Sequence, residues 1–541
     1  RPSIRGAVAA DRASAAPPEG RLSPELRRRE LLGSAAGLLV LACASGAPAQ
    51  IRRREFRVQT TERFDPSGIE PYAELHPRVY RHIDDHLEDH VEQLRRWLKQ
   101  PSVSAEGRGI EEMATLLRDD LRELGFQEAE LAPTDGHPGV FGSYDAGAQR
   151  TLLVYMMYDV QPVELDAWSV DPFAAELRDH ELGQVVMGRG AINQKGPERA
   201  FLNAIGSILA TEGRLPVNLL IAAEGEEELG SPHYPQVISR YEDRLRKADA
   251  VLFPAPRQTA TGTAGIRLGV KGIVYFEMEA VGGASGGPTR APIHSSFKSI
   301  VDAPAWRLVQ ALASLTTPDG NTIRVPGYYD PIREPTLEEQ RLVNAMRETW
   351  DDTVMQKTYG VEQWTEGMTG ERAILHYLYN TTLNIDGIWG GYTGPGTKTV
   401  LPHKATAKID SRLVPNQNPE DALRLIRAHL DREGFSDVVI RKLAGYPPAQ
   451  TSVEAPVVRT TISVYRKYGV VLSVWPRTGG SAPYYLFTDR LGLPMISAGL
   501  GHGGGFHAPD EYLVLRPKKG SKIAGLAEME RFYVDLLYAL G

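Results

Sequence analysis

Three loop segments of the chain carry residue types that suit acid–base and metal chemistry. Asp159 stands in YDVQP, directly after an apolar run, and Glu227 and Glu228 stand in EGEEELGS, after a second run. His507 stands in the glycine-rich segment GHGGGFHAPDEY. Carboxylates and imidazole are zinc ligands and are the usual general acids and bases of enzymes. Each segment alone is also typical of a solvated loop, so their joint placement in the fold decides between a site and plain surface.

The elements around these loops predict an α/β fold. Short apolar runs (TLLVYMM, VNLLIAA and DAVLF) alternate with helical stretches such as PERAFLNAIGSILATEG. This alternation is typical of a mostly parallel sheet covered by helices. Such sheets hold functional residues at the carboxyl ends of their strands, which is where Asp159 and Glu227 are expected. A further segment, GRGAINQKGPE at residues 188–198, opens a helix but lacks the spacing of a nucleotide-binding loop.

The α/β domain is predicted to be discontinuous, with residues 70–272 before an insertion and residues 416–541 after it. GIVYFEMEAVGG and LPHKATAKIDSRLVP both alternate like half-exposed strands, and a helical stretch lies between them near residues 303–314. Residues 273–415 are therefore expected to form an inserted α+β domain.

The composition and the first residues of the chain indicate which binding partners and which cellular compartment to expect. The chain has 541 residues and a formal net charge of -7, so no broad nucleic-acid surface is expected. Its single cysteine excludes an intrachain disulfide framework. Residues 1–49 combine paired arginines with a short apolar run and an Ala-Pro-Ala end, which predicts a twin-arginine export signal and a bacterial periplasmic location. The alternative is an accidental apolar patch in a disordered leader. The run is too short to predict a membrane span.

The motifs occur in the order of a known family. They are YDVQP, DPF, GRGA followed by QKGP, EGEEELGS, HSS, KTVLPHKATAKIDSRLVP, GGSAP and HAPDEY. From about residue 75 to 540 the chain resembles the two-domain zinc metallopeptidases that include carnosine dipeptidase, aminoacylase and succinyl-diaminopimelate desuccinylase, and most of all the carnosine dipeptidase branch. The resemblance implies a two-zinc α/β domain, an inserted domain used for dimerisation and as a lid, and hydrolysis of an amide bond.

The resemblance also implies a role for each acidic loop residue. Glu227 matches the general base that takes a proton from a metal-bridging water, and Glu228 matches the adjacent metal ligand. His507 matches the last ligand of the family. Asp159 matches an aspartate that orients a ligand histidine two residues before it.

Three ligand positions of the family are changed in this chain. Met157 stands at the histidine position, Asn193 at the bridging aspartate, and Ala255 at a further aspartate. Methionine is a weak donor for zinc, and a neutral amide is a poor bridge. We therefore expect Glu228 and His507 to hold at most one divalent metal ion, such as zinc, weakly and with Asn193 as a third contact, or no metal at all.

The positions that contact substrate still match the family. His294 falls at an oxyanion-stabilising histidine, often supplied to the partner subunit, and Thr399, Arg412 and Ser481 fall at substrate-holding positions. Arg412 suits a carboxylate, although an arginine on a strand is also typical of a surface ion pair. The resemblance therefore implies a small carboxylate substrate, with Asn193 as a further substrate contact, and a homodimer.

Three functions remain open from the sequence. The first is hydrolysis of a small N-acyl amino acid or dipeptide-like carboxylate, with Glu227 as general base and with His294 and Asp159 supporting it. The second is a metal-independent lyase, cyclase or isomerase, in which a carboxylate base works near Lys195, Asn193 and His294. The third is binding of a small carboxylate without catalysis.

Overall fold

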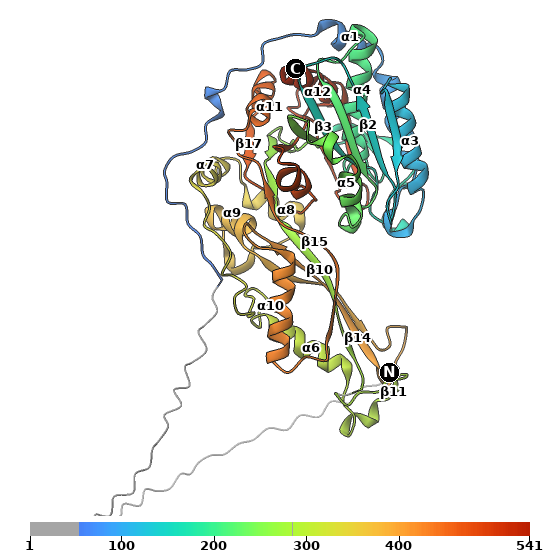
Figure 1. The fold of residues 1–541 in the computed structure, drawn as a ribbon, viewed down its shortest axis with the longest axis vertical. Helices are drawn as coiled ribbons and strands as arrows, with labels where there is room; N and C mark the ends of the chain where they lie inside the picture. The colour runs from blue at the N-terminus through green and yellow to red at the C-terminus, as the bar shows by residue number, and fades with distance from the viewer. Residues whose placement is uncertain (1–52, 284) are drawn as a thin grey trace, which may run out of the picture. The chain divides into compact units, whose positions relative to one another are not determined.

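The structure, a computed structural model, describes residues 53–283 and 285–541 (Figure 1). The predicted export signal at residues 1–49 lies outside the described residues. Two large sheets organise the described chain, and they confirm the predicted α/β class with a large, mostly parallel sheet. Within the described residues, no helix combines the length and apolarity needed to cross a membrane.

The first sheet supplies the strand ends on which the acidic loops stand. Its eight strands lie in the order β1 (Glu128–Ala132), β2 (Gly139–Tyr144), β6 (Asn218–Glu224), β3 (Thr151–Met157), β7 (Ala250–Pro254), β18 (Met495–Ala498), β8 (Ala264–Arg267) and β17 (Leu472–Trp475). From β6 to β18 each strand runs parallel to the next. Strand β8 pairs antiparallel with β18 and parallel with β17, and β1 and β2 are antiparallel. The parallel part therefore gathers several carboxyl ends at one edge.

Helices cover both faces of this sheet because alternate residues of its strands point to opposite sides. In β3, Val154 enters an apolar cluster that contains residues of α4 (Lys195–Glu212) and α12 (Leu526–Leu540). Tyr155 and Met157 enter a second cluster, which contains residues of α5 (Tyr234–Leu245). The end of β3 is thus closed off by apolar packing on the α5 side.

The second sheet belongs to the inserted segment. Its four antiparallel strands lie in the order β12 (Thr382–Gly390), β14 (Lys404–Leu413), β10 (Gly272–Val281) and β15 (Val439–Tyr446). Helices α6 (Pro304–Leu315) and α10 (Pro419–Arg432) pack against it. Since α10 and β15 follow residue 415, this sheet extends beyond the predicted end of the insertion.

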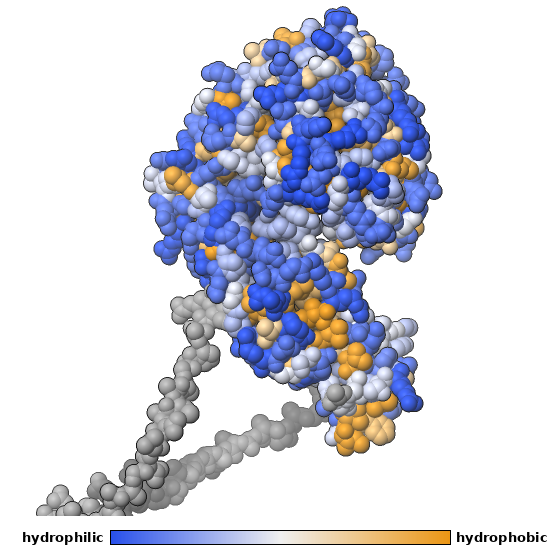
Figure 2. Space-filling model, in the orientation of Figure 1, coloured by the Kyte–Doolittle hydropathy of each residue, from blue (hydrophilic) through white to orange (hydrophobic). Residues whose placement is uncertain are grey.

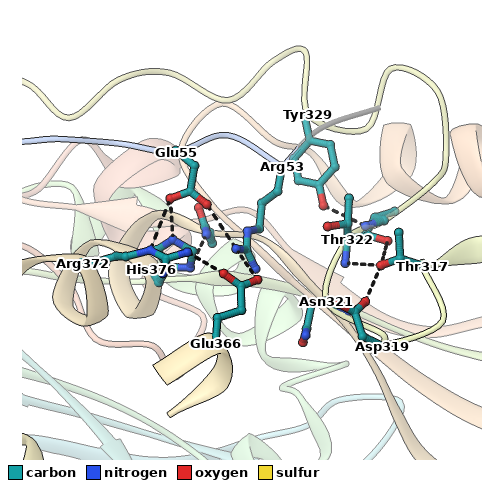
Figure 3. Close-up of polar contacts among 12 residues, drawn as sticks. Arg53, Glu55, Thr317, Asp319, Asn321, Thr322, Tyr329, Glu366, Arg372 and His376 are labelled. Atoms are coloured by element: carbon teal, nitrogen blue, oxygen red, sulfur yellow. Dashed lines mark hydrogen bonds and ion pairs between the residues drawn. The ribbon is translucent and has the colours of Figure 1, made fainter. Parts of the chain in front are cut away.

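The start of the described N-terminal segment contacts polar residues of the inserted segment (Figure 3). Arg53 donates a hydrogen bond to Glu366 at 2.9 Å, in the short turn Thr365–Gly367. Glu55 contacts His376 of α9 (Gly370–Tyr379) at 3.0 Å. Phe56, next in the chain, is buried in the apolar cluster of the second sheet. The start of this segment therefore packs with the second sheet's cluster, whereas Phe64, Ile69 and Tyr72 pack against the cluster of the first sheet.

Candidate active site

Neighbouring strand ends bring Asp159 to the turn that carries Glu227 and Glu228. Strands β3 and β6 run parallel and end together, with Met157 opposite Glu224. Asp159 Oδ1 accepts a hydrogen bond from the backbone N–H of Glu227 at 3.1 Å. Its Oδ2 accepts one from the backbone N–H of Glu228 at 3.0 Å. Asp159 therefore fixes the position of both glutamates.

The Asp159 carboxyl group is fully buried. Its Oδ2 also accepts a hydrogen bond from the Ser104 hydroxyl at 2.7 Å. Burial, and then the charge of Glu228, raise the pKa of Asp159 to about 7, while the hydrogen bonds that it accepts oppose this rise. The side chain consequently acts as the internal anchor of the turn. Ser104 was not anticipated from the sequence.

Glu227 is held by its backbone, and its carboxylate remains available. No hydrogen bond or ion pair with another described residue involves its carboxylate oxygens. Burial first, and then the neighbouring Glu228 and Asp159, raise the pKa of Glu227 well above its ordinary value. A carboxyl group with a raised pKa suits proton transfer near neutral pH. The position and environment of Glu227 are therefore compatible with the general base expected from the motif resemblance.

Asn193, Glu228 and His507 form one cluster of side chains. Asn193 Nδ2 donates to Glu228 Oε1 at 2.8 Å and lies 3.0 Å from His507 Nε2. His507 Nε2 is 3.4 Å from Glu228 Oε2, and this contact, opposed by burial, raises the pKa of His507. Gln161 Nε2 also donates to Glu228 Oε2, at 2.6 Å. The structure therefore brings together these three residues singled out by the sequence and adds Gln161, which the YDVQP motif contains.

The loop that carries Asn193 is held by Glu511, which is fully buried. Glu511 Oε1 accepts hydrogen bonds from the backbone N–H groups of Ile192 and Asn193, at 2.9 and 2.8 Å. Its Oε2 accepts from Gly190 N–H at 3.0 Å and from Arg189 Nη1 at 2.8 Å. This role was not predicted from the sequence, although Glu511 stands in the HAPDEY motif, directly after Asp510.

Met157 and Ala255 lie in apolar surroundings. Both are buried, with 2% and 1% of their surface exposed, and both belong to the apolar cluster on the α5 side of the first sheet. The backbone N–H of Met157 donates to Glu198 at 2.8 Å. Within residues 53–283 and 285–541, no group of three or more His, Cys, Asp or Glu side chains is placed to hold a metal ion.

The predicted substrate residues form two separate groups. Arg412 Nη1 donates to Ser481 Oγ at 3.0 Å, which joins the second sheet to the GGSAP loop. His294 Nε2 lies 3.1 Å from Thr399 Oγ1. No hydrogen bond or ion pair of the described residues links His294 to Glu227, and its short strand β11 (Ile293–His294) lies away from β3 (Figure 1).

Lys195 forms its hydrogen bonds with backbone carbonyl groups. It is fully buried, and its Nζ donates to the backbone carbonyls of Trp97 and Gln100, at 3.2 and 2.5 Å. Its ammonium group is thus held by these carbonyls on the side of α2 (Leu87–Lys99), within electrostatic reach of Asp159 and Glu511, and a role of Lys195 beside the carboxylate base stays a prediction.

Comparison with known proteins identifies the family. The model of Peptidase family M20/M25/M40 matches residues 153–520, which is more than half of the chain. The chain belongs to this family. It is a metallopeptidase-like hydrolase, as the motif resemblance predicted.

Curated relatives match most of the chain. The Cys-Gly metallodipeptidase dug1 of Schizosaccharomyces pombe is 30% identical over 66% of this chain and 75% of its own length. The human Beta-Ala-His dipeptidase is 29% identical over 71% of this chain and 77% of its own length.

A solved M20 family metallo-carboxypeptidase from Sulfolobus solfataricus, Sso-CP2, is 32% identical with a TM-score of 0.73, covering 84% of this chain and 98% of its own. Human carnosine dipeptidase 1 shares the fold with a TM-score of 0.72 at 24% identity, covering 86% of this chain and 99% of its own.

These relatives correct the predicted location. Relatives that match 66–80% of the chain are eukaryotic dipeptidases from yeasts and mammals, which contradicts the prediction of a bacterial periplasmic enzyme. The arginine pair and apolar run that suggested an export signal were therefore misleading, since short apolar stretches next to arginines also occur by chance in leader segments.

Proposed function

We propose that the protein hydrolyses the amide bond of a small dipeptide-like or N-acyl amino acid carboxylate, with Glu227 as general base. Relatives named as Cys-Gly and Beta-Ala-His dipeptidases support the reaction class. The observation that carries the proposal is the turn that Asp159 fixes by two backbone hydrogen bonds, which leaves the Glu227 carboxylate without a partner among the described residues. A general base needs this combination of fixed position and free oxygens.

In the proposed reaction Glu227 takes a proton from the attacking water and later delivers it to the departing amine. Arg412 binds the substrate carboxylate through its planar guanidinium group. Asp410, at 3.0 Å from Nε, and Ser481, at 3.0 Å from Nη1, hold this group at the junction of the second sheet and the GGSAP loop. Asn193 Nδ2 is a hydrogen-bond donor beside Glu228 and can contact the substrate. The negative charge that develops on the carbonyl oxygen requires further donors.

The residues present do not fit the two-zinc centre of the family. Met157 and Ala255 pack in an apolar cluster instead of offering ligands for one metal position. At the other position, Asn193 directs an N–H group at Glu228, where a bridging carboxylate would face the metal. We infer that Glu228 and His507 hold one divalent ion weakly or hold none, and that the carbonyl is polarised chiefly by protein donors.

The protein is proposed to act as a homodimer formed through the insertion. Figure 2 shows apolar side chains gathered on the surface of this part of the chain. Ile300 and Trp306 are among its exposed apolar residues, at 79% and 61% exposure, together with Ile385 and Ile388 of β12. Exposed apolar patches of this kind mark protein interfaces. A partner subunit could then bring its own copy of the His294 strand to the site.

One experiment separates hydrolysis from the alternatives. Release of free amino acids from a set of dipeptides is measured for the unchanged protein and for Glu227→Gln, each with and without a chelator. We expect Glu227→Gln to lower kcat by about 10²–10⁴-fold with unchanged folding, and Glu123→Gln, an exposed glutamate of α3 (Ile110–Glu123), to have no effect. Turnover that survives Glu227→Gln would overturn the proposed base.

A further inference from the structure

Two arginines near the site have aromatic rings as neighbours where acidic partners would be expected. The guanidinium carbon of Arg257 lies 5.2 Å from the ring centroid of Phe506, the residue before His507. That of Arg267 lies 3.8 Å from the ring centroid of Trp475. Among the described residues, neither guanidinium group forms an ion pair, and Nη1 of Arg267 is buried without any hydrogen-bond partner. Both side chains are half-buried, and charged groups removed from water are normally paired, so this pair is unusual.

The fold places the two arginines next to each other. Arg257 follows β7, the neighbour of β3, and Arg267 ends β8 directly opposite Trp475 of β17. Gly265 lies between them: a Cβ atom on this residue would stand 2.8 Å from Arg267 Nη1 and 3.3 Å from the backbone oxygen of Arg257. The absence of a side chain at this position leaves room for the Arg267 head group.

The pKa shifts of the two arginines are consistent with their lying close together. Burial, and then the positive charge of Arg257, lower the pKa of Arg267 to about 9. Burial also lowers the pKa of Arg257, whereas the Tyr484 hydroxyl and, more weakly, Glu227 oppose that effect. The pair therefore repels internally and lies within electrostatic reach of the proposed base. Two partly buried cations in this state gain from a bound anion.

We propose that Arg257 and Arg267 form a second anion-binding subsite, which takes a carboxylate on the acyl half of the substrate. The inference rests on the proposed function, in which Arg412 of the second sheet binds the carboxylate of the departing amino acid. Arg267 ends a strand of the first sheet and Arg257 follows another, so in this proposal the pair meets the other half of the amide. The substrate class is then an amide with an anionic group on each half, such as a dipeptide whose first residue is glutamate or aspartate.

Matched dipeptides test the subsite directly. Binding of Glu-Ala and of Gln-Ala to the full chain is measured by calorimetry in the Glu227→Gln variant, so that turnover does not interfere. We expect Glu-Ala to bind about tenfold more tightly or better, as for a hydrogen bond between charged groups. Arg257→Gln and Arg267→Gln should each bring this ratio close to one. Arg240→Gln, at an exposed arginine of α5, should leave the ratio unchanged.

Additional variants and substrates make the outcome unambiguous. Arg267→Lys keeps the charge and should retain part of the preference, which serves if Arg267→Gln does not fold. Equal affinity for Glu-Ala and Gln-Ala, or a preference that survives Arg257→Gln and Arg267→Lys undiminished, would overturn the subsite and leave the arginines as stacking residues only. If binding of Glu-Ala depends on the arginines but the unchanged protein does not hydrolyse it, only the proposed function is refuted. If the protein hydrolyses Glu-Ala and Gln-Ala without preferring Glu-Ala, only the subsite is refuted.

Discussion

The amide nitrogen of Asn193 donates a hydrogen bond to Oε1 of Glu228 at 2.8 Å. Two carboxylates at this separation would repel each other unless a cation stood between them. With asparagine at residue 193, the contact is attractive without a cation. Gln161 supplies a second amide donor to the same carboxylate, at 2.6 Å. The cluster around Glu228 is therefore satisfied by protein groups, at residues that the motif resemblance matches to metal-ligand positions.

The first prediction concerns metal stoichiometry. After dialysis against micromolar zinc, the unchanged protein is expected to hold at most one weakly bound zinc ion per chain, because Met157 and Ala255 supply no ligand. The combined variant Met157→His, Asn193→Asp and Ala255→Asp should bind two. Metal analysis by mass spectrometry gives the stoichiometry, and zinc should raise the melting temperature of the combined variant more than that of the unchanged protein. Two tightly bound zinc ions in the unchanged protein would contradict our interpretation of these positions.

A second prediction addresses the anchor of the acidic turn. Asp159→Ala removes the acceptor for the backbone N–H groups of Glu227 and Glu228. Leaving buried donors unpaired costs about 1–3 kcal/mol of unfolding free energy, and kcat should fall by about tenfold or more because the base is no longer held in place. Denaturant titration and steady-state kinetics measure the two effects.

Ser104→Ala is the matched control for the turn. It removes only the hydroxyl donor to Asp159 and keeps both backbone contacts. Its effect on stability should be smaller, and kcat should change little. If Asp159→Ala keeps the kcat of the unchanged protein, the turn does not depend on this carboxylate.

The sequence predicted the strands and helices that position the site, but it predicted fewer of the contacts between their side chains. Periodicity and strand–helix alternation predicted the run at residues 151–157 and the helix that begins near residue 195, both of which the structure contains as β3 and α4. These signals arise from burial, which leaves a local pattern in the chain.

Contacts between residues far apart in the chain could not be predicted from local patterns in the sequence. Glu511 and Gly190 are far apart in the chain, so nothing local showed that this carboxylate holds the Asn193 loop. Arg257 and Arg267 were likewise overlooked, since an arginine after a strand usually has a solvated or paired head group. Strand β15 pairs with β10 although α10 intervenes after β14, and no local pattern marked it as a member of the second sheet.

A third prediction tests how Arg412 recognises substrate. Arg412→Lys keeps a positive charge but loses the planar fork that suits a carboxylate. We expect kcat/KM for a dipeptide to fall about tenfold or more, mainly through KM. For the same dipeptide with a C-terminal carboxamide, the unchanged protein and the variant should differ little. An equal loss on both substrates would show that Arg412 acts through the fold, by its contact with Asp410 at 3.0 Å, and not on the carboxylate.

A fourth prediction follows from the raised pKa of Glu227. A general base works in its deprotonated form, so kcat/KM should fall as the pH drops through the pKa of Glu227. Burial, Glu228 and Asp159 all raise that pKa, so the fall should begin at a higher pH than for an ordinary glutamate. Asp159→Asn removes one of the negative charges and should move the acid limb of the profile to lower pH, whatever its effect on the maximal rate. A pH–rate profile of both proteins checks the direction, and an acid limb near pH 4 in the unchanged protein would contradict it.

The last prediction concerns the oligomer and the role of His294. Within one chain His294 contacts Thr399 and Ser296, and no described hydrogen bond links it to the Glu227 turn. A catalytic contribution from His294 therefore requires a partner subunit.

Trp306→Glu and Ile388→Glu place charges on exposed apolar positions of the insertion and should convert a dimer to monomers, as measured by light scattering. The monomer should lose activity to about the extent that His294→Ala does. Val471→Glu, at an exposed apolar residue before β17, should remain dimeric and active. A monomeric unchanged protein with full activity would remove His294 from the reaction.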